Sequence, residues 1–388
     1  MPSKIKILIL FYIFILVSLT IYSYSQIDLN LTLSSNSLYQ LFQNQMIQLG
    51  YFNRPLSTAI FLIILFLLFT IYYLLLKLVE QKKLSLAGSL WLIIASSIII
   101  FFAYPAFSHD FFNYMFDARI VTKYHANPYL FKALDFPDDL WIRFMHWTHR
   151  TYPYGPIWLL LTIPFSFLGF GKFVLTLLNF KLMFLLFHFC NIYLIYKILK
   201  KISPKNAIIG MAFYAFNPLI QIESIVSPHN EVVMLTFLLL GIYLFFIQQR
   251  KTFAILSLLF SVGIKFVTLI LLPFFVLYPK KKINWLLKSI LFMLIGALFV
   301  EIIYREPYPW YFILPIGVGA LLVENYIIRI VAVLTSLGVL LRYAPYLYQG
   351  NYNSEAVTFQ NWIFYSFLFL ILMFVIFNLA KKLIRIKE

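Results

Sequence analysis

Charged residues are scarce in this sequence. Asp, Glu, Lys and Arg make up 12% of the 388 residues, and 62% are hydrophobic, whereas a soluble domain carries about 25% charged residues. This composition excludes an ordinary soluble globular protein. Long apolar runs recur from one end of the chain to the other, each close to the roughly 20 residues that a helix needs to cross a bilayer.

Cysteine is almost absent. The single Cys190 lies in an apolar run, which excludes a disulfide framework and a cysteine-based metal site. The sequence has no HExxH-type spacing of metal ligands and no glycine-rich loop of the kind that cradles phosphates. Short strands of alternating polarity are missing too, which excludes an outer-membrane barrel.

The apolar runs predict an all-α polytopic membrane protein, one transmembrane domain over 1–388 with about 11–13 helices. We expect two N-terminal helices within 1–84, a core within 85–320 and further helices within 321–388. The first run follows a basic start, as in a signal peptide, but it is long enough to be an uncleaved helix. The predicted helices lie near 5–24, 57–79, 85–104, 156–170, 173–197, 206–224, 231–248, 252–278, 284–304, 310–323, 325–345 and 360–381.

The net charge of +17 does not indicate a nucleic-acid partner, because the basic residues form short clusters between the apolar runs. The positive-inside rule places such clusters in the cytoplasm, where they meet anionic lipid. We therefore expect a multi-pass protein with both termini cytoplasmic. The clusters are Lys4 with Lys6, 77–83, 197–205, 248–251, 278–282 and the C-terminal "KKLIRIK".

Two apolar runs do not fit a single crossing under this rule. The run 252–278 has basic clusters at both ends, so we predict two shorter helices that turn near Gly263, Ile264 and Lys265. The run 156–170 is short and contains Pro164, and it is expected to be an interfacial or re-entrant helix. The large loop 105–155 and the loop 343–360 are then non-cytoplasmic, and ten of the 14 acidic residues lie on that side or at its edge.

Polar residues first gather where the run 85–104 ends. His109, Asp110 and Asn113 follow it directly, and Asp117 shares a helical face with Asp110 if 110–124 is helical. The apolar positions of this segment predict a helix lying in the membrane interface. Asp110 also fits a helix N-cap, whereas ionisable groups at the membrane edge are candidates for function. Tyr114 lies on the polar side as well, and Asp117 and Arg119 also suit helix-stabilising ion pairs.

A second group of candidates lies farther along the chain. Lys265 stands in the middle of an apolar run, where a lysine costs about 3 kcal/mol unless it borders a polar cavity. A cation in such a place suits an anionic group such as phosphate. Aromatic residues at the edge of the membrane are consistent both with a membrane belt and with stacking on sugars. The further binding candidates are Tyr152 in "TYPYGPIW", Glu223, His229, Asn230 and Glu231 in "IESIVSPHNE", and Arg305, Trp310 and Tyr311 in "YREPYPWY".

Five motifs in matching order resemble those of the GT-C superfamily of integral membrane glycosyltransferases. "SHDFFNYMFDARIVTKYHANPY" resembles their first outer loop, and "TYPYGPIW" looks like the segment that returns to the membrane. "FNPLIQIESIVSPHNE", "GIKFVTLILLP" and "EPYPWYFILP" are similar to three later segments, so the resemblance covers roughly 85–320. Within that superfamily the chain resembles polyprenol-phosphate-mannose-dependent mannosyltransferases, although Asn230 and Ala118 replace the Asp and Gly frequent there.

The resemblance implies a GT-C-like bundle whose first outer loop is catalytic. A sugar, expected to be mannose, would pass with inversion from a polyprenyl-phosphate carrier to an acceptor hydroxyl outside the cytoplasm. The acceptor would be a glycan, a lipid or a protein, and the membrane the plasma (inner) membrane. Asp110 maps onto the catalytic Asp and would act as general base. The resemblance implies no metal and no cofactor besides the lipid-linked donor.

Two other functions fit a polytopic chain of this composition. A flippase or transporter of lipid-linked saccharides would normally show inverted repeats and paired broken helices, and the sequence has no visible repeat and one candidate broken hairpin. A polymerase or ligase of such saccharides is also polytopic, with large outer loops. A third possibility is a non-catalytic scaffold subunit, which would not depend on Asp110.

Overall fold

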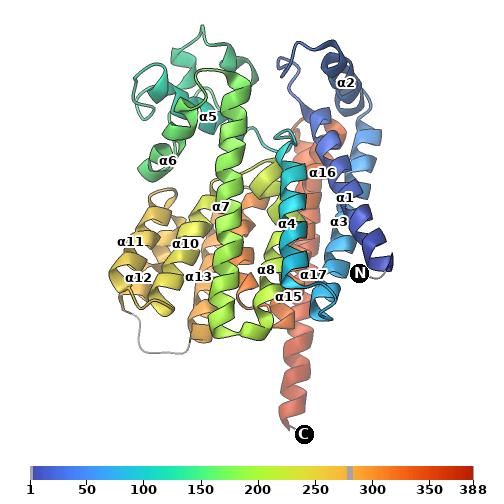
Figure 1. Cartoon of the computed structure of the whole chain (residues 1–388), viewed down its shortest axis with the longest axis vertical. Helices are drawn as coiled ribbons and strands as arrows, with labels where there is room; N and C mark the ends of the chain where they lie inside the picture. The colour runs from blue at the N-terminus through green and yellow to red at the C-terminus, as the bar shows by residue number, and fades with distance from the viewer. Residues whose placement is uncertain (1–2, 278–282, 388) are drawn as a thin grey trace.

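The protein is helical throughout the part that the structure describes, residues 3–277 and 283–387 of a computed structural model (Figure 1). Helices account for 78% of the structure and no strand occurs among the described residues, so the predicted all-α class is confirmed. Six helical stretches are long and apolar enough to cross a membrane. They are Ser3–Gln26, Arg54–Glu80, Phe173–Ile202, Ile283–Tyr304, Tyr326–Gln349 and Ser354–Lys382.

The individual elements of these stretches follow the apolar runs closely. Side-chain caps fix several starts; for example, the Ser85 hydroxyl accepts a hydrogen bond from the Gly88 N–H at 3.1 Å. The long helices are α1 (Ser3–Ser23, followed by the 3₁₀ turn η1, Tyr24–Gln26), α3 (Arg54–Glu80), α7 (Phe173–Ile202), α13 (Ile283–Tyr304), α15 (Tyr326–Leu341) with α16 (Tyr343–Gln349), and α17 (Ser354–Lys387).

Shorter helices complete the bundle, and they explain why a count of apolar runs gives 11–13 helices. Six apolar helices have only 10–17 residues, so by length they fall short of the usual span. The shorter elements are α2 (Ser37–Ile47), η2 (Gln48–Phe52), α4 (Leu86–Phe101), α5 (Asp110–Thr122), η3 (Ala133–Asp135), η4 (Leu140–Phe144), α6 (Pro156–Phe167), η5 (Pro204–Asn206), α8 (Ala207–Ala215), α9 (Pro218–Gln221), η6 (Ile222–Val226), α10 (Glu231–Phe246), α11 (Lys251–Val262), η7 (Phe266–Leu271), α12 (Leu272–Val276), η8 (Pro309–Phe312) and α14 (Ile313–Ala320).

Two of the predicted apolar runs are broken in the structure. The predicted turn near Gly263 is confirmed, since α11 ends at Val262 and 3₁₀ helix η7 begins at Phe266. The run 206–224, predicted as one segment, is instead bent by 55° between Ala215 and Pro218. Asn217 caps the second half, accepting a hydrogen bond from the Leu219 N–H at 2.9 Å, and Pro218 cannot continue the first half.

The predicted outer loop 343–360 is largely helical, which corrects the sequence prediction. Helix α16 fills most of its first half, and α17 begins at Ser354. Gly350 ends α16 in the left-handed conformation, with a φ of +79°, so only 351–353 connect the two helices as a turn. The charged and polar residues of this stretch suggest a loop, but most of them lie on helices.

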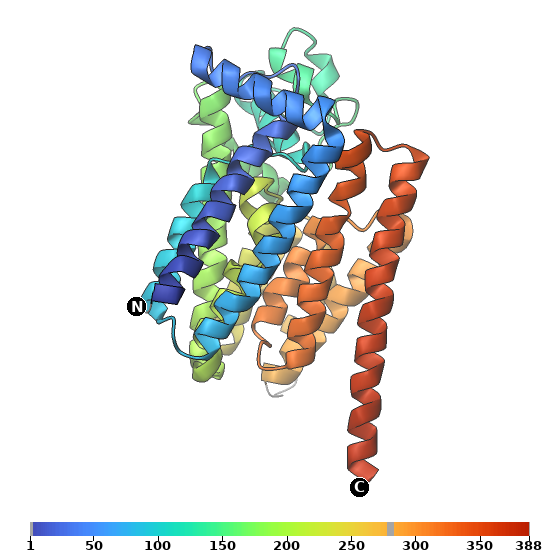
Figure 2. The same cartoon turned by 90° about the vertical axis from the view of Figure 1, so that its right-hand side faces the viewer.

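The bundle has two different ends. Both labelled termini, the α3–α4 turn and the α7–α8 turn lie at its lower end in Figures 1 and 2, and these segments carry the basic clusters. The loop 105–155 lies at the opposite end together with α2, α5 and α6. This arrangement agrees with the prediction that the basic clusters lie on one side and the loop 105–155 on the other.

A close backbone contact ties the end of the large loop to the break after α11. The Gly155 N–H donates to the Ile264 carbonyl at 2.9 Å, and the Ile157 N–H donates to the Gly263 carbonyl at 3.0 Å. A Cβ added at Gly155 would lie 2.2 Å from the Gly263 carbonyl oxygen. Only glycine at position 155 allows the two backbones to approach this closely.

Replacing Gly155 with Ala is therefore expected to lower the apparent unfolding temperature of the purified protein. The backbone dihedrals of Gly155 suit any residue, so the loss comes from the clash alone, about 1–3 kcal/mol as for other overpacked sites. The measurement is thermal unfolding in detergent. Gly296→Ala is the matched control, because a Cβ there meets no atom within 4 Å; equal unfolding temperatures of the two variants would contradict the clash.

Candidate functional site

Asp110 is the first residue of α5, and the chain before it is fixed to a distant segment. The Phe107 N–H donates to the Ser227 hydroxyl at 2.9 Å, and the Phe107 ring stacks on that of Tyr343 with centroids 5.0 Å apart. The Asp110 N–H approaches the Ser108 hydroxyl at 3.3 Å. The carboxylate therefore stands at the junction between the helix bundle and the loop 105–155.

Helix α5 is enclosed by protein rather than laid on a membrane surface, unlike the interfacial helix that the sequence predicted. Nine of its 13 residues are buried. Phe112 packs against Phe144 of η4 and Phe173 of α7, and Tyr114 packs edge-on against Trp158 of α6. The apolar positions of α5 thus pack against other parts of the protein.

The two turns of the loop, "HANPYL" and "TYPYGP", are bound to each other. The Tyr152 N–H donates to the Pro128 carbonyl at 2.9 Å, and the Tyr129 hydroxyl donates to the Tyr154 carbonyl at 3.0 Å. The Tyr129 and Tyr152 rings meet edge to face at 5.0 Å. Tyr152, a predicted binding residue, thus shapes the turn that carries Tyr154 towards α5, where the Tyr114 and Tyr154 rings meet at 5.4 Å.

Lys265 lies at the break after α11 and is held by Glu231. Its ammonium is 2.5 Å from the Glu231 carboxylate, whose side chain is 5% exposed. The same ammonium lies 5.4 Å from the centre of the Tyr154 ring, a cation–π distance. The backbone pairing of Gly155 with Ile264 explains this placement, because it brings Tyr154 beside Lys265. The structure therefore joins the two separately predicted polar segments.

Asp110 faces this group of charges. Burial raises the pKa of its carboxyl, and the nearby Lys265, Arg150, Trp147 and His146 oppose that rise. Arg150 and Trp147 belong to the end of the same loop, and the Trp147 carbonyl accepts from the Asn113 amide at 3.4 Å. A carboxyl whose pKa lies above the ordinary Asp range binds a proton more readily, which suits a general base.

Asp117 also faces Arg150 and Asp110, as their shared helical face predicted. Burial raises the pKa of Asp117 to about 8, with Asp110 adding to the rise and Arg150 opposing it. The folded protein then keeps this proton up to about pH 8, whereas the unfolded chain releases it near its ordinary pKa of 3.8. Raising the pH through this window therefore favours the unfolded state.

We expect Asp117→Asn to remove part of the loss of stability that wild type suffers between pH 5 and pH 8. The measurement is the apparent unfolding temperature of the two proteins across this range. Asp138→Asn is the control, since Asp138 is exposed in the same loop. Parallel curves for wild type and Asp117→Asn would contradict a proton held by Asp117 in the folded state.

Glu223 and His229 form a buried pair beside a stack of aromatic rings. The Tyr343 hydroxyl donates to Glu223 at 2.8 Å, and the other Glu223 oxygen lies 3.1 Å from the His229 Nδ1. The His229 ring stacks on Trp310 with centroids 4.0 Å apart, and Trp310 stacks on Tyr308 at 4.5 Å. Trp310 is thus anchored to the turn before α10 rather than exposed as a membrane belt.

Several buried polar atoms around Asp110 and Lys265 have no hydrogen-bond partner among the described residues. Native interiors leave few such groups unpaired, since each unpaired group costs about 1–3 kcal/mol. A substrate with several hydroxyl groups would pair with them. The atoms are the Asn113 Oδ1, the Tyr114 hydroxyl, the His229 Nε2, both side-chain amide atoms of Asn230 and the Glu231 Oε2.

Two predicted binding residues are not brought to this group. The Arg119 guanidinium is 2.8 Å from Asp139 and lies over the Trp141 ring at 4.0 Å. Lys123 and Tyr124 bind the same carboxylate. Burial alone would raise the pKa of Asp139, but the hydrogen bonds that the carboxylate accepts outweigh burial, so the pKa lies below its ordinary value. Arg305 is mostly exposed and pairs with Glu301 at 3.3 Å. Burial raises the pKa of the Tyr311 hydroxyl, and the nearby Glu231 adds to the rise.

Lys181 in α7 is a further part of the site that the sequence motifs do not include. Its ammonium is buried and donates to the Ala103 carbonyl at 2.7 Å and to the Val226 carbonyl at 3.2 Å. These carbonyls end α4 and η6, the two segments that lead to Asp110 and His229, so Lys181 joins both halves of the site. A signal exists, because Lys181 is the single Lys, Arg, Asp or Glu between Phe173 and Tyr196. Arg342, which binds Glu306 at 2.5 Å, also lies outside the sequence motifs.

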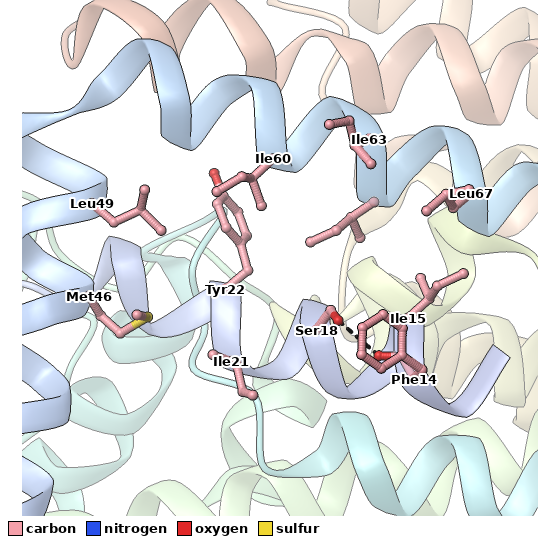
Figure 3. A pocket seen from close by; sticks show the side chains of 11 residues that line it. Phe14, Ile15, Ser18, Ile21, Tyr22, Met46, Leu49, Ile60, Ile63 and Leu67 are labelled. Carbon is pink, nitrogen blue, oxygen red and sulfur yellow. Dashed lines mark hydrogen bonds between the residues drawn. The ribbon is translucent and has the colours of Figure 1, made fainter. Parts of the chain in front are cut away.

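An apolar cavity of about 350 Å³ lies apart from these residues, between α1, α3 and the end of α2 (Figure 3). Ile15, Ile60 and Leu67 are typical of its lining, and its Ser18 hydroxyl is bound to the Phe14 carbonyl. With so few polar groups it suits a hydrocarbon chain and not a sugar. The polar chemistry of the molecule is gathered around Asp110 instead.

The fold and the site together define a polytopic helical membrane protein with a polar, carboxylate-bearing site at one end of its bundle. Residues 17–281, more than half of the chain, match the family described as alpha-(1->6)-mannopyranosyltransferase, N-terminal domain. The chain therefore belongs to this family of mannosyltransferases, and the predicted resemblance to GT-C mannosyltransferases is confirmed. Comparison with curated proteins and with solved structures gives no match.

Proposed function

We propose that the protein transfers mannose from a polyprenyl-phosphate carrier to an acceptor hydroxyl on the non-cytoplasmic side of the membrane, with inversion at the anomeric carbon. The observation that carries this proposal is the proximity of the Asp110 carboxyl and the Lys265 ammonium, which come from distant segments and lie close enough for their charges to interact. Buried polar atoms without partners among the described residues lie around them. Membership of a mannosyltransferase family supports the sugar.

Asp110 is the proposed general base. It takes the proton of the acceptor hydroxyl while the acceptor oxygen forms a bond to the anomeric carbon. The bond between that carbon and the phosphate oxygen breaks, and polyprenyl phosphate leaves with the electron pair. Inversion that yields an α-linkage requires a donor whose sugar is β-linked to phosphate.

Lys265 is the proposed partner of the leaving phosphate. A preformed cation at the place where negative charge develops lowers the barrier without reorganisation of solvent. Glu231 holds the ammonium in position at 2.5 Å and balances its positive charge. Trp310 and Tyr308 offer faces on which a sugar can stack.

Helix α5, which begins at Asp110, lies at the end of the bundle opposite the basic clusters (Figure 1), and this supports a reaction outside the cytoplasm. No separate metal or cofactor enters the proposed transfer step, because the donor already carries an activated sugar. We expect acceptors that present the O6 hydroxyl of an α-mannoside, in line with the linkage that the family name prints.

Purified protein in proteoliposomes, supplied with radiolabelled polyprenyl-phosphate mannose and an alkyl α-mannoside, tests this proposal. We expect a labelled disaccharide with an α-1,6 bond. Movement of labelled lipid across the bilayer with no new glycosidic bond would support a flippase and contradict the transferase. Products longer than a single added sugar from a lipid-linked oligosaccharide would support a polymerase.

A further inference from the structure

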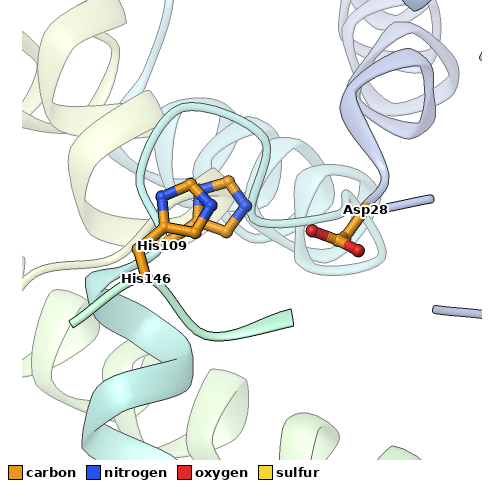
Figure 4. Close-up of side chains that lie close together, drawn as sticks. All are labelled: Asp28, His109 and His146. Atoms are coloured by element: carbon orange, nitrogen blue, oxygen red, sulfur yellow. The ribbon is translucent and has the colours of Figure 1, made fainter. Parts of the chain in front are cut away.

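His109, His146 and Asp28 lie close together although they come from three separate parts of the chain. Each offers one ligand atom, and these atoms all lie within 4.8 Å of one another (Figure 4). Asp28 follows η1, His109 directly precedes α5, and His146 follows η4. The two imidazole rings stack with centroids 3.6 Å apart and an interplanar angle of 12°.

The ring nitrogens of both histidines are without a hydrogen-bonding partner among the residues that the structure describes. Asp28 is partly fixed, since one of its carboxylate oxygens accepts from the Asn30 N–H at 2.8 Å. An outer hydrogen bond of this kind orients a ligating carboxylate. Two imidazoles and one carboxylate thus offer unused lone pairs, and the stacked rings would have to rotate out of their parallel arrangement for both to direct a nitrogen at one ion.

This donor set has the chemistry of a first-row divalent cation site. Imidazole nitrogens suit Zn²⁺, Co²⁺ and Ni²⁺, whereas Mg²⁺ and Ca²⁺ prefer sites made of oxygen atoms alone. A tetrahedral zinc ion with Zn–N bonds of about 2.0–2.1 Å separates its ligand atoms by roughly 3.4 Å. The ligand atoms would have to approach one another by up to about 1.4 Å through side-chain rotation, and a fourth position would be left for water.

The site is directly connected to Asp110. His109 precedes Asp110 in the chain, and His146 precedes Trp147, whose side chain is close enough to the Asp110 carboxyl to lower its pKa. The Trp147 carbonyl also accepts from Asn113 on the next turn of α5. An ion shared by His109 and His146 would therefore fix both sides of Asp110 at once.

We propose that Asp28, His109 and His146 bind one first-row divalent cation, with Zn²⁺ as the expected ion, and that this ion positions Asp110 without taking part in bond making. The positioning role rests on the proposed function, whereas the binding site stands on the geometry alone. Metal binding is therefore tested first, in the absence of any sugar.

The test uses the full chain, purified in detergent with a tag that has no histidines and stripped with a chelator. Equilibrium dialysis against Zn²⁺ with metal analysis is expected to give one tightly bound ion per chain. His146→Ala and Asp28→Asn are expected to weaken binding by about 10–100-fold or more. His149→Ala is the matched control, an exposed histidine three positions farther along the same loop.

The visible absorption of bound Co²⁺ is a second measurement, and a residue with only a structural role would not change it. We expect visible absorption bands typical of a four-coordinate nitrogen and oxygen site in wild type and His149→Ala, and their loss in His146→Ala and Asp28→Asn. Wild type that binds no more Zn²⁺ than His146→Ala would overturn the site, and the cluster would then be a histidine stack beside a carboxylate. Tight binding with transfer unchanged after chelation would overturn the positioning role alone.

Discussion

Asp110→Asn is expected to lower the turnover of mannosyl transfer by about 10²–10⁴-fold, the usual contribution of a general base. Asn has nearly the same shape and can keep the contact with Trp147, but it cannot take the acceptor proton. The KM for the lipid donor is expected to change little, because the change removes an interaction used in the transition state. The measurement is steady-state transfer from radiolabelled polyprenyl-phosphate mannose.

Asp138→Asn is the control for that measurement, because Asp138 is an exposed acid in the same loop. This variant is expected to transfer mannose at the wild-type rate. An unfolding temperature of Asp110→Asn close to that of wild type would show that the loss is chemical. Full turnover in Asp110→Asn would remove the base assignment while leaving the family membership intact.

Lys265→Met is expected to lower transfer by about 10²–10³-fold, the range found when one preorganised group at a developing charge is removed. It should also destabilise the protein, because Glu231 is buried and would lose its counter-charge. Breaking a fully buried pair costs about 3–5 kcal/mol, and the partial exposure of Lys265 at 26% makes a smaller loss the expectation.

The double variant Lys265→Met with Glu231→Gln separates the two effects. Removing the stranded charge should restore most of the unfolding temperature, while transfer stays low because the cation is still missing. Lys172→Met, at an exposed lysine, serves as control. Recovery of transfer together with stability would mean that Lys265 acts only as the counter-ion of Glu231.

Half of the site can be predicted from the sequence, because its charged residues stand within or next to apolar runs. Asp110 at the end of an apolar run and Lys265 within another are energetically expensive placements, so each indicates function from the sequence alone. The break after α11 is predictable as well, because the basic clusters at both ends of 252–278 require it. Lys181 offers an equal signal, but the length of the apolar run around it indicates only a membrane-spanning helix.

Pairings between distant segments are not predictable in the same way. Nothing near Arg119 in the sequence indicates that Asp139 will bind it, since the loop must first fold back over α5. The approach of Asp28, His109 and His146 depends on three separate segments, so it leaves no local spacing to recognise. The bend at Asn217 and Pro218 is visible as a dipeptide, but the apolar residues on both sides favour one continuous helix.

The backbone contacts at the two ends of the loop 105–155 have a kinetic consequence. Phe107 is fastened to Ser227 at one end, and Gly155 and Ile157 to the break after α11 at the other. Any opening of this loop during turnover must therefore bend the segment between the two fixed ends, because movement of the whole loop would break these hydrogen bonds.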